Sequence, residues 1–306
     1  MTGCDYAPIM KPLPIPAVRQ GNAPAAAFIV DRVPPHAYFM VSAVFHYLGP
    51  AFAVLLFAHV EPLGVAWLRI ASAAAIFAGW RRPWRYYRGL QPAAKRSVLM
   101  LGAVLALMNV CFYLAIARLP LGTVGAIEFL GPIALAALGM RSRRNLAALA
   151  FAVAGVCLLT HVRLAGQPLG FVFAFANCAL FILYIILGHR IAADGGTAGI
   201  DRLGFAMLVA MVVAFPFGIR QAIPAFVSPL LLAAAIGVGV SSSVIPYVCE
   251  QLAMARLPRA TFALLLAILP AMACLIGAVV LHQLPTGAEV TGIALVIGGV
   301  LLHRTS

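Results

Sequence analysis

The sequence predicts an all-α integral membrane protein with ten transmembrane helices, arranged as two inverted five-helix repeats. Three observations support this fold class. Of 306 residues, 64% are hydrophobic and only 9% are charged; apolar runs of membrane-spanning length alternate with short polar gaps; and one segment recurs after an odd number of spans. A chain with 8 acidic and 21 basic residues cannot form the charged surface of a soluble protein of this size, so lipid must cover most of it.

The net charge of +13 does not indicate a nucleic-acid partner, because the basic residues lie in short gaps between apolar runs and not on one folded face. They are typical of topology signals instead. The six cysteines are far apart and form no C-x-x-C pair, which favours neither a zinc site nor a disulfide framework. We therefore expect no metal and no cofactor.

Ten apolar runs approach the length of about 20 residues that a helix needs to cross a bilayer core. Polar gaps separate them and mark each exit from the membrane. The tenth run is short. The runs are Ala37 to Phe57, Leu63 to Trp80, Ser97 to Ala117, Leu121 to Met140, Leu146 to Val162, Leu169 to Leu187, Leu203 to Ile219, Leu230 to Ala255, Ala260 to Leu281 and Ala288 to Leu302.

Basic residues are distributed unevenly over the two ends of these spans. Most lie at one end, as in the gap after the second span, whereas the opposite gaps hold only Arg118, Arg163 and Arg220. Because Lys and Arg are retained on the cytoplasmic side, both termini are predicted to be cytoplasmic in a protein of the inner membrane. Residues 1–36 are rich in proline, lack the apolar core of a signal peptide, and are predicted to form a disordered cytoplasmic tail.

An internal repeat relates Leu114–Gly139 to Leu252–Gly277. Both segments contain A-R-L-P and, in the same register, a second proline, which is Pro132 or Pro270. The first copy joins spans three and four and the second joins spans eight and nine, so the repeat unit is five helices. An odd unit gives the halves, residues 37–163 and 164–306, opposite orientations. Carriers that alternate between two conformations around a midplane site have this architecture.

Polar residues gather near the predicted midplane when each span is bisected between its flanking polar residues. They come from spans one to four, six and eight, including the serines at 241–243. We expect these spans to surround a polar cavity, which span nine completes by symmetry, while spans five, seven and ten are peripheral. The candidate residues for substrate binding or coupling are Glu128, Arg69, Asn109, Tyr113, Glu250, Tyr247, Tyr184, Asn177 and His46.

Glu128 carries the strongest indication, because a midplane carboxylate is costly unless it faces a cavity or a partner. Glu250 is the other intramembrane acid, and bisection places it about 12 Å nearer the cytoplasm. Arg69 lies at nearly the depth of Glu128, so the cavity can receive a zwitterion. Arginine would bind a carboxylate through two hydrogen bonds, and Glu128 would take an ammonium group or a proton.

Other interpretations of these residues stay open. Arg69 can pair with Glu128 or extend toward the membrane surface, and His46 can be a hydrogen-bonded packing residue. Pro132, Pro246 and Pro270 predict helix kinks near the site. The sequence lacks H-E-x-x-H, G-x-S-x-G and P-loop motifs, which disfavours a membrane enzyme and an ATP-driven pump. A channel is a further alternative, although single central charges in inverted halves favour a carrier over a pore with charged rings.

Residues 109–138 resemble the EamA family of the drug/metabolite transporter superfamily, and within it the bacterial threonine and homoserine exporters. The segment contains N-x-x-F-Y, P-L-G and an E-F-x-G-P core that runs from Glu128 to Pro132. Further matches are Arg69 in the second span and the S-x-x-x-P-Y-x-x-E segment from Ser242 to Glu250, which R-L-P follows. The resemblance covers residues 37–303.

The resemblance implies a secondary transporter that exports small amino-acid-like solutes of the threonine/homoserine type, by proton-coupled alternating access. Another metabolite or a drug-like solute is the alternative on the same fold. The family usually carries M-E-P in the ninth span, whereas Leu269 precedes Pro270 here. Coupling must then depend on Glu128 or Glu250, or be absent. The expected partners are a small-molecule substrate, the lipid bilayer and protons, and the oligomeric state stays open.

Overall fold

The structure is a computed structural model that describes residues 33–139, 143–161, 167–192, 198–257, 265 and 268–302. These residues contain helices and no β-strand, and those from Pro35 onward belong to one compact unit. Residues 1–32, which make up most of the predicted tail, lie outside the described part, so the disorder of that tail stays a prediction.

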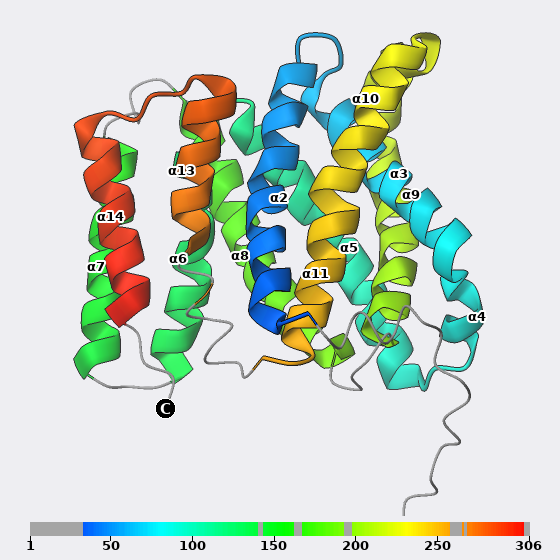
Figure 1. The fold of residues 1–306 in the computed structure, drawn as a ribbon, viewed down its shortest axis with the longest axis horizontal. Coiled ribbons are helices and arrows are strands. Elements are labelled where there is room, and N and C mark those ends of the chain that lie inside the picture. Colours follow the sequence, from blue (N-terminus) through cyan, green and yellow to red (C-terminus); the bar gives the residue numbers. More distant parts are fainter. Residues whose placement is uncertain are drawn as a thin grey trace, which may run out of the picture. The chain divides into compact units, whose positions relative to one another are not determined.

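Each of the first four described helices begins at a proline, where the missing N–H would have had no helical partner in any case. The fourth predicted span is a helix that continues through Pro132. One short helix follows the second predicted span and was not anticipated. The helices, shown in Figure 1, are α2 (Pro35–Leu56), α3 (Pro62–Arg81), α4 (Pro83–Arg88), α5 (Pro92–Ile116), α6 (Leu121–Gly139) and α7 (Arg143–His161).

In the later part of the chain, the eighth predicted span is a continuous helical stretch with a π-helical turn, η1, in its middle. Residues 258–264, at the start of the ninth predicted span, lie outside the described part. The elements are α8 (Pro168–Ala192), α9 (Ala198–Val227), α10 (Pro229–Gly239), η1 (Val240–Val244), α11 (Ile245–Met254), α13 (Ile268–Leu281) and α14 (Gly287–Leu302).

Six of the described helical stretches are long and apolar enough to cross a membrane, and four shorter apolar helices accompany them. Large apolar side chains point outward: Val212, Leu230 and Val279 are 66%, 78% and 65% exposed. So much exposed apolar surface fits contact with lipid and not with water. The protein is therefore a multi-pass membrane protein, while the number of ten crossings stays a prediction.

The helices pack in pairs that are distant in sequence: α3 on α9, α6 on α13, α7 on α14, α2 on α11 and α5 on α8 (Figure 1). The α3–α9 pair is tied by the guanidinium of Arg81, whose Nε and Nη2 donate to the Asp201 carboxylate at 2.8 and 2.9 Å. A Cβ at Gly49 of α2 would overlap Ser242, so this glycine permits the close approach of α2 to η1.

Candidate functional site

A buried cavity of about 20 Å³ lies between α2, α3, α5, α6, α8 and α11. These are the six spans that the sequence predicted to surround it. The described residues of α13 contribute nothing to its lining, so the expectation that the ninth span completes the cavity is wrong for them. The volume suffices for about one water molecule. The lining residues are His46, Pro50, Arg69, Met108, Asn109, Phe112, Glu128, Asn177, Phe181, Tyr184 and Tyr247.

Glu128 is 3% exposed, and two neutral donors hold its carboxylate. The side-chain amide of Asn177 donates to Oε1 at 3.0 Å, and the hydroxyl of Tyr47 donates to Oε2 at 3.2 Å. Among the described residues, Glu128 has no Lys or Arg in ion-pair contact. The carboxyl group can therefore gain or lose a proton without breaking a fixed ion pair.

Glu250 of α11 is held in a similar way. Its Oε1 accepts a hydrogen bond from Ser42 Oγ at 3.0 Å, and its Oε2 accepts one from Tyr184 Oη at 2.7 Å. Bisecting the spans separated this acid from Glu128 by about two helical turns. The structure instead brings the carboxylates of Glu128 and Glu250 to the same side chain.

That side chain is His46. Its Nδ1 lies 3.2 Å from Oε1 of Glu250, and its Nε2 lies 3.9 Å from Oε2 of Glu128. The ring makes edge contacts with Tyr47 and Phe181, with centroids 5.1 and 6.5 Å away. His46 therefore packs against aromatic rings, as one interpretation of the sequence expected, and it also contacts both intramembrane acids. No group of His, Cys, Asp and Glu in the described part of the chain has the arrangement of a metal site.

Arg69 is anchored to the π-helical turn. Its Nε donates to Ser243 Oγ at 2.8 Å and its Nη2 donates to the Ser242 carbonyl at 2.7 Å. That carbonyl needs a donor because Pro246, four residues later, has no N–H. Arg69 and Glu128 line one cavity, but no direct ion pair joins them among the described residues. Two of the five N–H groups of Arg69 serve these bonds.

The remaining predicted residues surround this core. Asn109 lines the cavity, but its side-chain amide donates to the Leu105 carbonyl of its own helix at 2.7 Å. Tyr113 lies behind the lining, with its ring centroid 5.6 Å from the Arg69 guanidinium carbon. Tyr184 and Tyr247 line the cavity, and their ring centroids lie 5.7 Å apart.

The predicted prolines have different settings. Pro246 lies two residues after the end of the π-helical turn, which is a form of helix irregularity common at functional sites. The backbone around Pro132 is helical throughout, and Pro270 lies buried in the first turn of α13. Neither position marks a break in its helix among the described residues. The kinks expected at Pro132 and Pro270 therefore stay predictions.

The sequence reasoning missed the apolar lining residues Met108, Phe112 and Phe181, and it also missed Ser42, Tyr47 and Pro50. Ser42 lies one helical turn before His46, on the same face, and this spacing was a usable signal. Pro50 lines the cavity and has no N–H for the carbonyl of His46, four residues earlier. Tyr47 is fully buried, and its hydroxyl reaches Glu128.

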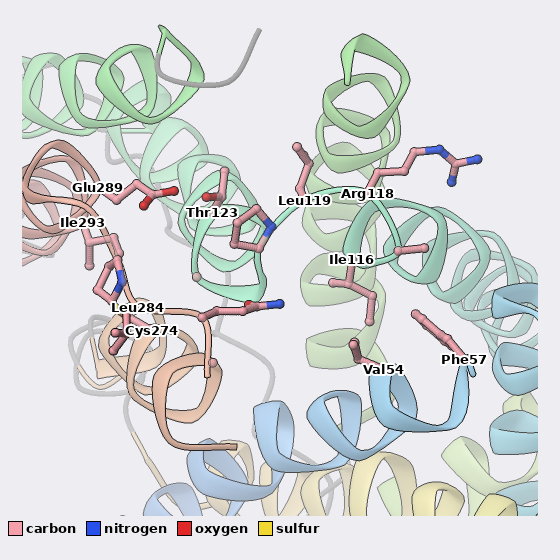
Figure 2. A pocket seen from close by; sticks show the side chains of 16 residues that line it. Val54, Phe57, Ile116, Arg118, Leu119, Thr123, Cys274, Leu284, Glu289 and Ile293 are labelled. Carbon is pink, nitrogen blue, oxygen red and sulfur yellow. The ribbon is translucent and has the colours of Figure 1, made fainter. Parts of the chain in front are cut away.

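A larger pocket of about 450 Å³, here called the vestibule, lies where α2 and α5 end and where α6 and α14 begin (Figure 2). Val54 of α2 belongs to it and Pro50 belongs to the central cavity, so about one helical turn separates the two spaces. Glu289, in its wall, accepts hydrogen bonds from Thr286 N and Oγ at 2.8 and 3.0 Å, a capping box for α14.

Comparison with known proteins gives this geometry a context. The model of the EamA-like transporter family matches residues 168–305. The threonine/homoserine exporter RhtA of Salmonella typhimurium is 32% identical over 256 residues, which cover 81% of this chain and 84% of the relative. The protein of that name in Escherichia coli is 30% identical over the same shares.

A solved crystal structure matches with a TM-score of 0.55 and 19% identity, and the match covers 87% of this chain and 96% of the other. At that identity the likeness concerns the fold alone. The exporter relatives match at 30% identity or more over most of both chains. The chain therefore belongs to the EamA-like transporter family, which is a family of transporters and not of enzymes.

Proposed function

We propose that this protein is a secondary transporter that exports a small amino-acid-like solute, of the threonine/homoserine type, across the cytoplasmic membrane. The observation that carries the proposal is the central cavity, in which Arg69 and the carboxylate of Glu128 line the same space, and Glu128 has no Lys or Arg partner among the described residues. The membership of the exporter relatives in the same family adds to it.

In this proposal, Arg69 binds the substrate carboxylate. Its guanidinium is oriented by Ser243 and by the Ser242 carbonyl, and N–H groups remain for the substrate. Glu128 binds the ammonium group, with its carboxylate oriented by Tyr47 and Asn177. Asn109, Tyr113, Tyr184 and Tyr247 supply the polar and aromatic surroundings.

The transport cycle in this proposal exchanges access between the two sides. The packing of the helices supports an inverted repeat. The pairs α3–α9, α6–α13 and α7–α14 each join a helix of the first half to its predicted counterpart in the second. The two-fold axis of such a repeat also converts the pair α2–α11 into the pair α8–α5, and both pairs are in contact. The vestibule faces the predicted outer side, whereas the central cavity has room for about one water. Substrate must therefore enter through a conformation in which the cavity widens, with both termini, including residues 1–36, in the cytoplasm.

Proton coupling in this proposal depends on Glu128, which binds either a proton or the substrate ammonium. Leu269 stands where the family usually has an acid, and it is 3% exposed. It offers no titratable group, so the coupling function falls to the acids around His46. Competition between proton and ammonium at one carboxylate makes proton influx and solute export mutually dependent.

The experiment that tests the proposed function is counterflow in proteoliposomes. The purified full chain is reconstituted, the vesicles are loaded with unlabelled threonine, homoserine or a hydrophobic amino acid, and entry of the labelled solute is followed. Protein-free vesicles are the control. We expect saturable counterflow for at least one of these solutes. No counterflow for any of them, with monodisperse protein, would remove the amino-acid assignment and favour another metabolite or a drug-like solute.

A further inference from the structure

We propose that His46 relays a proton from Glu128 to Glu250, and that Glu250 releases it toward the cytoplasm. This inference rests on the proposed proton-coupled export. It assigns separate tasks to the two buried acids: Glu128 exchanges proton for substrate, and Glu250 never binds substrate. From the sequence, His46 could be explained as a packing residue. In this proposal it connects the two acids.

The geometry of the imidazole supports the relay. Its two nitrogens point in diverging directions, and each faces a different carboxylate, with Nδ1 3.2 Å from Glu250 and Nε2 3.9 Å from Glu128. The shorter distance permits direct proton transfer. The longer one exceeds a hydrogen bond, but His46 and Glu128 both line the central cavity, whose volume of about 20 Å³ admits one bridging water.

The groups around His46 leave the two acids free to change charge. Both carboxylates are held by neutral donors, whereas Arg69, the cation of the cavity, is bonded to η1. The titratable and charged groups that face His46 are Tyr47 of its own helix, Arg69 of α3, Glu128 of α6, Tyr184 of α8, and Glu250 and Tyr247 of α11.

The transfer balances with a neutral ring at its start and end. Protonated Glu128 gives its proton to Nε2, and Nδ1–H gives its proton to Oε1 of Glu250. Glu128 becomes a carboxylate that can bind ammonium, and Glu250 becomes a carboxylic acid. When the cavity opens to the cytoplasm, Glu250 loses the proton to water, and the ring regains its first tautomer by proton exchange with water. Each proton entering thereby makes room for one solute leaving.

The test compares two readouts of the same proteoliposomes. An acid lumen drives labelled solute inward if solute and proton exchange, and a difference of one pH unit supports about tenfold accumulation at one proton per solute. Counterflow at equal pH measures substrate translocation without net proton movement. We expect His46→Gln, which keeps hydrogen-bonding groups but cannot relay a proton, to lose the accumulation driven by the pH gradient, while its counterflow falls by a smaller factor.

Matched controls and outcomes make the test decisive. His59→Gln changes an exposed histidine beyond α2 and should behave as wild type. Glu250→Gln is nearly isosteric and should show the same selective loss as His46→Gln. If His46→Gln is not monodisperse, Glu250→Gln alone tests the relay. Wild-type accumulation in either folded variant would overturn the relay. So would an equal loss of both readouts, which would make His46 a positioning residue. Absence of counterflow in the wild type would instead reject the proposed function.

Discussion

Nδ1 of His46 lies 3.2 Å from Oε1 of Glu250, although 204 positions separate the two residues in the chain. The contact joins α2 to α11, and the same ring faces Glu128 of α6 through Nε2. One acid from each predicted half therefore meets a single histidine. A change of charge at either acid therefore alters the electrostatic environment of the other through this ring. The contact links the two predicted halves at the place where substrate is proposed to bind.

Glu128→Gln should abolish coupled export. The amide keeps the shape, and its single oxygen can still accept from either Asn177 or Tyr47, but it offers no charge to an ammonium group. Hydrogen bonds to charged groups contribute about 1.5–3 kcal/mol, so we expect substrate affinity to fall about ten- to hundredfold. Binding and counterflow titrations measure this. Glu61→Gln, at an exposed acid, is the matched control. Retained coupled export in folded Glu128→Gln would contradict the role of Glu128.

Arg69→Lys should weaken substrate binding although it preserves the charge. A lysine ammonium carries its three donors on one nitrogen and lacks the planar fork of a guanidinium, so it cannot hold the Ser242 carbonyl, Ser243 and a substrate carboxylate together. We expect a rise in the half-saturating solute concentration of about tenfold or more. Arg88→Lys, at an exposed position, should have no effect. Equal affinity in Arg69→Lys and wild type would mean that Arg69 does not contact the substrate.

Pro246→Ala should alter the orientation of the Arg69 guanidinium, although residue 246 is not one of its hydrogen-bond partners. The alanine supplies an N–H that can satisfy the Ser242 carbonyl within the helix, so this oxygen no longer requires Arg69 Nη2. We expect η1 to shift toward an α-helix and the half-saturating concentration to rise. Pro229→Ala, at the first position of α10, removes no such constraint and is the control. Unchanged transport in Pro246→Ala would show that the π-helical turn does not position Arg69 for function.

Gly49→Ala should destabilise the protein. The new methyl group would overlap Ser242, and overpacking of this kind costs about 1–3 kcal/mol. Gly79→Ala is the matched control, because no atom lies within 4 Å of the added Cβ and alanine favours the helix. Thermal unfolding in detergent should show a lower midpoint for Gly49→Ala and an equal or higher one for Gly79→Ala. The opposite order would contradict the described approach of α2 to η1.

Much of the candidate site follows from one physical rule, that polar groups at membrane depth are expensive and face a cavity or a partner. The rule led to His46, Arg69, Asn109, Glu128 and Asn177, which line one cavity in the structure. Their roles in transport stay proposals. The rule does not identify a tyrosine next to another polar residue, such as Tyr47. It also does not identify a proline such as Pro50, which acts by leaving a backbone carbonyl without its helical N–H donor.

Other features depend on tertiary contacts that a single sequence does not reveal. The serines at 241–243 predicted polarity at mid-membrane, but the π-helical turn that they form, its hydrogen bond from Arg69 and its close approach to Gly49 are tertiary features. Glu250 was placed by the depth of its backbone, whereas the packing of α11 on α2 brings its carboxylate to His46. Helix α4 lies in a gap that was interpreted only as a basic loop.

The central claim is that a zwitterionic solute leaves through this cavity in exchange for protons. The most direct measurement is uptake of labelled threonine and homoserine into proteoliposomes with an acid lumen, compared with vesicles at equal pH. The account predicts saturable accumulation above equilibrium that collapses when a protonophore is added. Saturable entry that reaches the same level with and without the gradient would contradict proton coupling, and no entry beyond protein-free vesicles would contradict the assignment of the solute.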